Sequence, residues 1–86
     1  MRVAFTESAW VDYQWIAEND RKLLKRLNTV LRDALRDPFS GIGKPEALKA
    51  NLAGYWSRRV TGEHRLVYAM RDEQLLIVSC RFHYRK

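Results

Sequence analysis

The chain has 86 residues, of which 47% are hydrophobic and 30% charged, and this composition is typical of one globular domain spanning residues 1–86. A single cysteine excludes an internal disulfide bond, and one Cys with two His is too few for a structural zinc site. The longest apolar run, at residues 75–79, is far shorter than the ~20 residues of a membrane-spanning helix. Without a signal peptide at the N-terminus, a reducing cytoplasm is the expected location.

The basic residues are concentrated in the second half of the chain. The formal net charge is +6, and the pI is near 9.9. Residues 1–39 carry seven basic and six acidic side chains, whereas residues 40–86 carry nine basic and four acidic ones. Most of the basic residues in the second half are arginines, whose planar guanidinium binds phosphate bidentately. A well-solvated surface is the alternative, but the pattern favours a nucleic-acid partner.

The first half of the chain predicts a strand followed by two helices. Arg2–Thr6 is short and β-prone. Ser8 is placed to cap a first helix, which Asn19 and Asp20 end, and Asp20 is placed to cap a second. The second helix ends at Asp37-Pro38. Its apolar stripe follows helical spacing over more than three turns: Leu23, Leu24, Leu27, Val30, Leu31, Ala34 and Leu35.

The second half predicts a long loop and three strands. Residues 39–54 lack periodicity and contain three glycines, which indicates an irregular segment. Strands are predicted at Tyr55–Val60, His64–Met70 and Gln74–Phe82, with a tight hairpin connection at residues 61–63. The order β-α-α-β-β-β indicates an α+β domain in which two N-terminal helices cover one face of a largely antiparallel sheet.

Two groups of charged residues in this half are candidates for chemistry. Glu46 lies in the predicted loop between Lys44 and Lys49, although a single loop carboxylate is usually only solvated. Arg59 and Arg65 flank the predicted hairpin and are placed to face each other across it. Two guanidinium groups so placed would repel each other unless an anion lay between them. The alternative is that each arginine is separately solvated.

A histidine and several aromatic residues complete the set. His83 follows the last predicted strand and can transfer protons at neutral pH, although an isolated histidine there is more often an ordinary surface residue. Aromatic side chains interleave with the arginines and are suited to stack on bases, although core packing is the default for at least two of them: Tyr55, Trp56, Phe82 and Tyr84.

RNA can be cleaved without a metal if a base removes the 2′-OH proton, cations stabilise the phosphorane and an acid protonates the 5′-oxygen. In this chain the base would be Glu46 and the acid His83. The cations would be Arg65 with Arg59 and Lys49. The sequence has no P-loop, zincin or nucleophile-elbow motif, and no cofactor is expected.

Five segments of this sequence resemble the YoeB toxins of the RelE superfamily, which are ribosome-dependent mRNA interferases of bacteria. The resemblance covers nearly the whole chain, and these segments carry it: Gly43-Lys44-Pro45-Glu46-Ala47-Leu48-Lys49, Asn51-Leu52, Trp56-Ser57-Arg58-Arg59-Val60, Glu63-His64-Arg65-Leu66-Val67-Tyr68-Ala69 and Cys80-Arg81-Phe82-His83-Tyr84. The chain departs from the family in the two residues after the tyrosine, Arg85 and Lys86.

The resemblance implies a microbial-RNase-like RelE fold and cleavage of translated mRNA in the ribosomal A site. It implies Glu46 as general base, His83 as general acid and Arg65 as the group that stabilises the transition state. Phosphate binding and substrate orientation are implied for Lys49, Arg59 and Tyr84. Lys44 and Arg58 belong to the same basic set and are predicted to bind substrate.

Cleavage by this route predicts a 2′,3′-cyclic phosphate or 3′-phosphate and a 5′-hydroxyl as products. The expected partners are mRNA on the 70S ribosome, ribosomal RNA and a YefM-like antitoxin, with no membrane and with a homodimer left open. Two alternatives are a non-catalytic nucleic-acid-binding module and an inactive RelE-fold protein that acts only in repression with an antitoxin. Neither of them needs both a carboxylate beside the phosphates and an imidazole, which speaks against them.

Overall fold

The computed structural model describes residues 1–82, so the predicted site residues His83 and Tyr84 lie outside the described part of the chain. The elements follow one another in the order β1 (Arg2–Phe5), α1 (Glu7–Asn19), α2 (Arg21–Arg36), β2 (Glu46–Ala47), the single-turn 3-10 helix η1 (Ala50–Leu52), β3 (Trp56–Arg59), β4 (Arg65–Arg71) and β5 (Gln74–Ser79).

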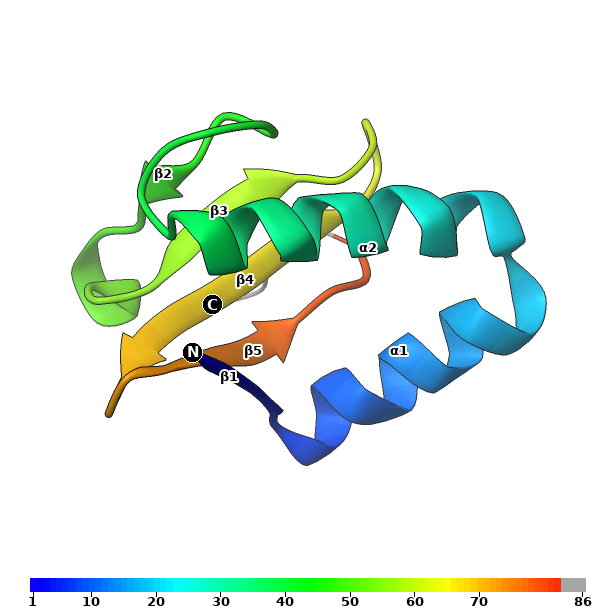
Figure 1. Ribbon diagram of the computed structural model, residues 1–86, viewed down its shortest axis with the longest axis horizontal. Coiled ribbons are helices and arrows are strands. Elements are labelled where there is room, and N and C mark those ends of the chain that lie inside the picture. Colours follow the sequence, from blue (N-terminus) through cyan, green and yellow to red (C-terminus); the bar gives the residue numbers. More distant parts are fainter. Residues whose placement is uncertain (83–86) are drawn as a thin grey trace.

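The strands of the described part form one sheet in the spatial order β1-β5-β4-β3-β2. β1 runs parallel to β5, and every other pair of neighbours is antiparallel. The helices α1 and α2 lie on one face of this sheet, and within residues 1–82 the opposite face carries no α-helix (Figure 1). This arrangement confirms the predicted α+β fold with a largely antiparallel sheet.

The hydrophobic core lies between the helices and the sheet. The apolar stripe of α2 supplies Leu27 and Val30, both fully buried. The sheet supplies the alternate residues Tyr68, Leu75 and Ile77, because side chains two apart on a strand share a face. β5 lies between β1 and β4, so this apolar strand is interior to the sheet. None of the helices in residues 1–82 is long and apolar enough to cross a bilayer.

The helix ends agree with the sequence except at the first N-cap. The Asp20 carboxylate accepts a hydrogen bond from the Leu23 N–H (3.0 Å), as predicted. The first helix is capped by Thr6 rather than by Ser8, and Thr6 Oγ1 accepts from the Ala9 N–H at 3.2 Å. β1 ends at Phe5, so the extended residue that precedes the helix is Thr6, and Ser8 already lies in the first turn.

The predicted irregular segment and the strand ends show the main differences from expectation. Residues 39–54 contain β2 and η1. A two-residue strand exists only because β3 pairs with it, so local propensity does not reveal it. β5 ends at Ser79 and not at Phe82, because the chain turns away there and the Arg65 N–H donates to the Phe82 carbonyl (3.0 Å). The other ends of the predicted strands agree with the structure or differ from it by one residue.

Cys80, which follows β5, is fully buried against the first helix. Its Sγ lies 3.6 Å from the Ala9 carbonyl oxygen, to which the thiol donates. Burial raises the pKa of this thiol to about 12, and the nearby Asp12 carboxylate adds to the shift. The thiol is therefore uncharged and acts as a small core side chain.

Candidate active site

The candidate site lies on the face of the sheet that the helices leave uncovered. Ser57 pairs with Glu46 on one side and with Val67 on the other, and Arg59 pairs directly with Arg65. The residues that alternate with them point into the core and include Trp56, Arg58, Leu66 and Tyr68. The pleat therefore places Glu46, Arg59 and Arg65 on the same open face.

Glu46 and Arg65 form an ion pair across this face. Arg65 Nη1 lies 3.8 Å from Glu46 Oε1, which is too long for a direct hydrogen bond. The Glu46 side chain is 64% exposed and the Arg65 side chain 18%. Because Ser57 between them is small, the carboxylate reaches diagonally over β3 towards β4. The carboxylate oxygens thus stay accessible to a ligand while a partly buried guanidinium lies beside them.

Arg59 and Arg65 are directly opposite each other in the β3-β4 ladder, as the sequence predicts. Like charges in such a cross-strand pair destabilise a sheet unless an anion screens them. Within residues 1–82 Arg65 has one carboxylate partner, at 3.8 Å, so the pair retains excess positive charge. The arrangement is suited to bind an anionic group such as a phosphate above the sheet.

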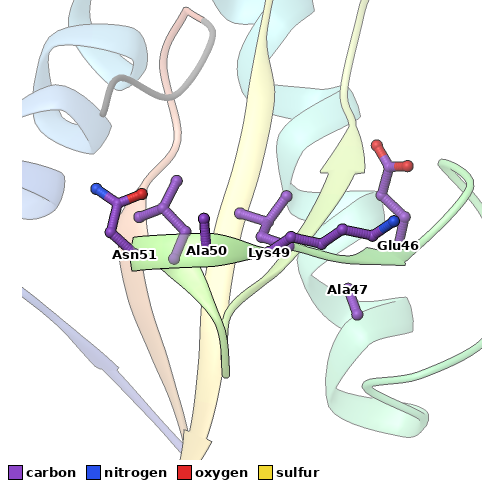
Figure 2. Close-up of a pocket in the computed structure, with 7 residues that line it drawn as sticks. Glu46, Ala47, Lys49, Ala50 and Asn51 are labelled. Atoms are coloured by element: carbon purple, nitrogen blue, oxygen red, sulfur yellow. The ribbon is translucent and has the colours of Figure 1, made fainter.

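Lys49 adds a third cation at the edge of the face. It precedes η1 and is exposed. Its side chain extends along β2 towards Glu46 (Figure 2). The side chain of Ala47 points to the opposite side of the strand from that of Glu46. Residues 46–52 line an open pocket of about 310 Å³ here. The predicted grouping of Glu46 with Lys49 in one place is therefore seen in the structure.

Lys44 is exposed at the turn that brings the loop back to the sheet. Its backbone has φ +51°, and Gly43 before it has φ +79°. The Arg59 N–H donates to the Gly43 carbonyl at 2.7 Å, and a Cβ on Gly43 would lie 2.6 Å from the Arg59 carbonyl oxygen. A glycine is therefore required, and its contact with β3 brings the Lys44 backbone next to Arg59.

Arg58 does not lie at the open face, which corrects the prediction that it binds substrate. Its side chain is fully buried. Its three nitrogens donate to Tyr68 Oη (2.8 Å), Asp33 Oδ2 (2.7 Å) and the carbonyls of Ile42 (3.1 Å), Ser40 (3.0 Å) and Asp37. The donors are occupied by protein groups, so Arg58 fixes the loop after α2 to the sheet instead. In the sequence, Arg58 alternates with the apolar Trp56 and Val60, and this pattern places it on the core side.

Asp33 provides the charge that balances Arg58. Its pKa is lowered from 3.8 to about 2, first by the hydrogen bond from the Ile42 N–H and then by those from Arg36 and Arg58. Among residues 1–82, no three His, Cys, Asp or Glu side chains lie close enough together to hold a metal ion.

Comparison with known proteins identifies the family. The family model for the YoeB-like toxin of bacterial type II toxin-antitoxin systems matches residues 5–84. The toxin YoeB of Synechocystis sp. is 63% identical over 86 residues, which is the whole of both chains. The chain belongs to the YoeB-like toxins. It is thus a toxin of the toxin-antitoxin class, and the resemblance found in its motifs is confirmed.

Solved structures of YoeB-like toxins share the fold. A YoeB/ParE toxin from Agrobacterium tumefaciens matches with a TM-score of 0.94 and 45% identity, covering 98% of this chain and all of that one. A YoeB-YefM complex and a YoeB dimer, both from Staphylococcus aureus, match with TM-scores of 0.89 and 0.88 at 44% and 45% identity, covering 98% of each chain.

His64, to which the sequence patterns assign no role, lies next to the candidate site. It comes directly before Arg65, and its Nδ1 accepts a hydrogen bond from the Phe82 N–H at 2.7 Å. A histidine in a strand-start position carries no local signal for such a contact, because its partner is 18 residues away. Trp56, by contrast, lies on the core side against Phe39 (ring centroids 5.0 Å apart), so it is not placed to stack on bases.

Proposed function

We propose that this toxin is an endoribonuclease that cleaves translated mRNA in the ribosomal A site by metal-free general acid–base catalysis. The observation that carries the proposal is the open-face group of Glu46, Arg65 and Arg59, in which an accessible carboxylate lies beside two cations that have no full counter-charge among residues 1–82. A protein that only binds nucleic acid has no need of a carboxylate in its phosphate site, because the carboxylate repels the phosphate.

In the proposed reaction Glu46 removes the proton from a 2′-hydroxyl, and the 2′-oxygen attacks the adjacent phosphorus. The bond from phosphorus to the 5′-oxygen then breaks, and His83 supplies the proton that this oxygen needs. Arg65 stabilises the charge that develops on the phosphorane oxygens, while Arg59, Lys49 and Lys44 bind the phosphate. The products are a 2′,3′-cyclic phosphate, or the 3′-phosphate formed from it, and a 5′-hydroxyl. The roles of His83 and Tyr84 rest on the family resemblance.

The open shape of the face supports a substrate held by a larger assembly. The site combines the exposed Glu46 carboxylate with an open pocket at one edge of the sheet, so it offers little to fix a flexible RNA strand. Catalysis needs the reacting atoms aligned, and an mRNA already held on the ribosome meets this need. The net charge of +6 favours docking onto ribosomal RNA through phosphate contacts.

Neutralisation is proposed to come from a cognate YefM-like antitoxin. The related Staphylococcus aureus toxin is known in a YoeB-YefM complex. An acidic antitoxin segment that folds onto the open face would meet Arg59, Arg65 and Lys49 and would exclude mRNA. Gel filtration of the toxin with the protein encoded beside it tests this, and the absence of a complex would contradict it.

The sharpest test of the chemistry uses altered mRNA on programmed ribosomes. A single 2′-deoxy nucleotide at the scissile position removes the nucleophile and should abolish cleavage at that site only. Cleavage that continued there, with a 3′-hydroxyl product, would overturn the proposed mechanism. If the toxin bound the programmed ribosome but cut neither the normal nor the 2′-deoxy mRNA, the result would instead support the binding-module alternative.

The acid and the base can be separated by replacing the bridging 5′-oxygen with sulfur. A thiol has a pKa near ~8.5, so the thiolate leaves without protonation. His83→Ala should be strongly impaired on normal mRNA and largely rescued on the 5′-thio substrate, whereas Glu46→Ala should stay slow on both. Rescue of Glu46→Ala alone would reverse the two assignments.

A further inference from the structure

The turn after β5 is held by two consecutive residues at the start of β4. The Phe82 N–H donates to His64 Nδ1 at 2.7 Å, and the Phe82 carbonyl accepts from the Arg65 N–H at 3.0 Å. The N–H and the carbonyl of Phe82 are thus hydrogen-bonded to two residues, His64 and Arg65, that follow each other in the chain. One of these neighbours is Arg65, whose side chain lies in the candidate active site.

The backbone of Phe82 is strained and depends on these bonds. Its φ is +60°, in the left-handed region that bulky aromatic residues rarely adopt. The side chain is 44% exposed, so core packing does not hold it in place. The His64 ring packs against the Phe82 ring with centroids 5.2 Å apart. A strained residue persists only where its surroundings determine it, and here these surroundings include His64, Arg65 and the Arg81 guanidinium, which lies 4.7 Å from the Phe82 ring centroid.

The backbone of His64 is held by three hydrogen bonds, and the contact with Phe82 selects one tautomer of its imidazole. Its side chain is only 13% exposed. Its carbonyl accepts from the N–H groups of Val60 and Thr61 at 2.9 and 3.2 Å, and its own N–H donates to Thr61 Oγ1 at 3.1 Å. A backbone N–H can only donate, so Nδ1 accepts from Phe82 and the proton of the neutral ring is on Nε2.

We propose that His64 is a positioning residue, which uses Nδ1 to hold the Phe82 turn and so sets where the chain leaves the sheet beside Arg65. The residue that follows Phe82 in the sequence is His83, the proposed general acid, so Phe82 is the described residue next to it in the chain. This inference rests on the proposed function for its catalytic consequence. The hydrogen bond itself is measurable without any activity.

Three substitutions separate the acceptor atom from the bulk of the ring. Asn carries an amide oxygen close to the place of Nδ1, so His64→Asn keeps the acceptor. His64→Gln has the same amide one methylene further out, near the place of Nε2, and loses it. His64→Leu keeps similar volume without any acceptor. Thermal unfolding of all three checks that they fold, and His64→Gln serves as the loss variant if His64→Leu does not.

The hydrogen bond is read by amide exchange of Phe82, followed by NMR in the free toxin. Exchange of this one amide should be faster by about tenfold in His64→Gln and His64→Leu, as expected for one lost hydrogen bond, and close to normal in His64→Asn. Equal protection in all four proteins would overturn the proposal.

The catalytic consequence is read by single-turnover cleavage on mRNA-programmed ribosomes, as a function of toxin concentration. At saturation His64→Gln and His64→Leu should be slower on the order of 10–10²-fold, with half-saturation unchanged, because misalignment affects the reaction and not ribosome binding. His64→Asn should restore most of the rate. Normal rates in variants whose Phe82 amide has lost protection would overturn the positioning role. Absence of cleavage by the unaltered toxin would overturn the proposed function, while the amide measurement would still report on the hydrogen bond.

Discussion

Arg58 and Arg59 are neighbours in β3, but the pleat sends their side chains to opposite faces of the sheet. On the covered face, Arg58 is fully buried and donates to five acceptors, one of them the carboxylate of Asp33. On the open face, Arg59 is exposed and lies directly opposite the like charge of Arg65.

The contrast shows how one residue type serves stability on one face and ligand binding on the other. A buried cation is stable only when protein groups satisfy it, and it then has nothing left to offer a ligand. A cation on the open face, next to another cation, keeps its capacity to bind an anion. Four experiments test this difference between the two faces.

The largest expected effect is on stability, from removal of Arg58. Arg58→Ala leaves Asp33 and several carbonyls without their donor, and the free energy of unfolding should fall by about 3–5 kcal/mol. Urea unfolding measures this, with Arg59→Ala as the matched control, for which a change within about 0.5 kcal/mol is expected. Equal losses in the two variants would contradict the division of roles.

The next effect is on catalysis, from removal of Arg65. Loss of a preorganised cation from the phosphorane should slow cleavage by about 10²–10³-fold, on the scale seen for oxyanion-hole donors. Single-turnover cleavage on programmed ribosomes measures the rate, and Arg21→Ala in the first turn of α2 is the control. If Arg21→Ala slowed the reaction as much as Arg65→Ala, the site would be misplaced.

A smaller loss is expected for Arg59→Ala. Arg59 shares the open face with Arg65, but Glu46 pairs with Arg65 at the proposed centre. Loss of one charge-assisted contact to a phosphate should cost about tenfold in rate. The same assay compares the cleavage rates of Arg59→Ala and Arg65→Ala. A greater loss of rate in Arg59→Ala would indicate that the reaction takes place nearer the hairpin.

The smallest effect concerns acid stability on the covered face. The pKa of Asp33 is about 2, below the ordinary 3.8, so the folded state favours the charged form. The stability that Asp33 contributes is thus present above about pH 3.8 and is lost as the pH falls towards 2. In Asp33→Asn the free energy of unfolding should depend less on pH in this window. Asp37, whose pKa is also lowered, through the Phe39 N–H, should leave a residual dependence.

The sequence predicts those parts of the molecule that local pattern controls. The stripe of α2, the Asp20 cap and the cross-strand pairing of Arg59 with Arg65 follow from periodicity and spacing. β2 and the Phe82 turn do not, because each depends on a partner that is distant in the chain. Its charge predicts that Arg58 binds substrate, whereas its alternation with Trp56 and Val60 places it on the covered face. Charge alone does not distinguish a satisfied arginine from an available one.

The buried thiol of Cys80 can report transient separation of α1 from the end of β5. The thiol is protonated and enclosed between the end of β5 and α1, so an alkylating reagent reacts with it only in molecules where these elements have separated. The chain contains one cysteine, so the labelling signal comes from a single place without any engineered mutation. The alkylation rate in native buffer then gives the frequency of this separation, and an antitoxin that binds only the closed protein would slow it.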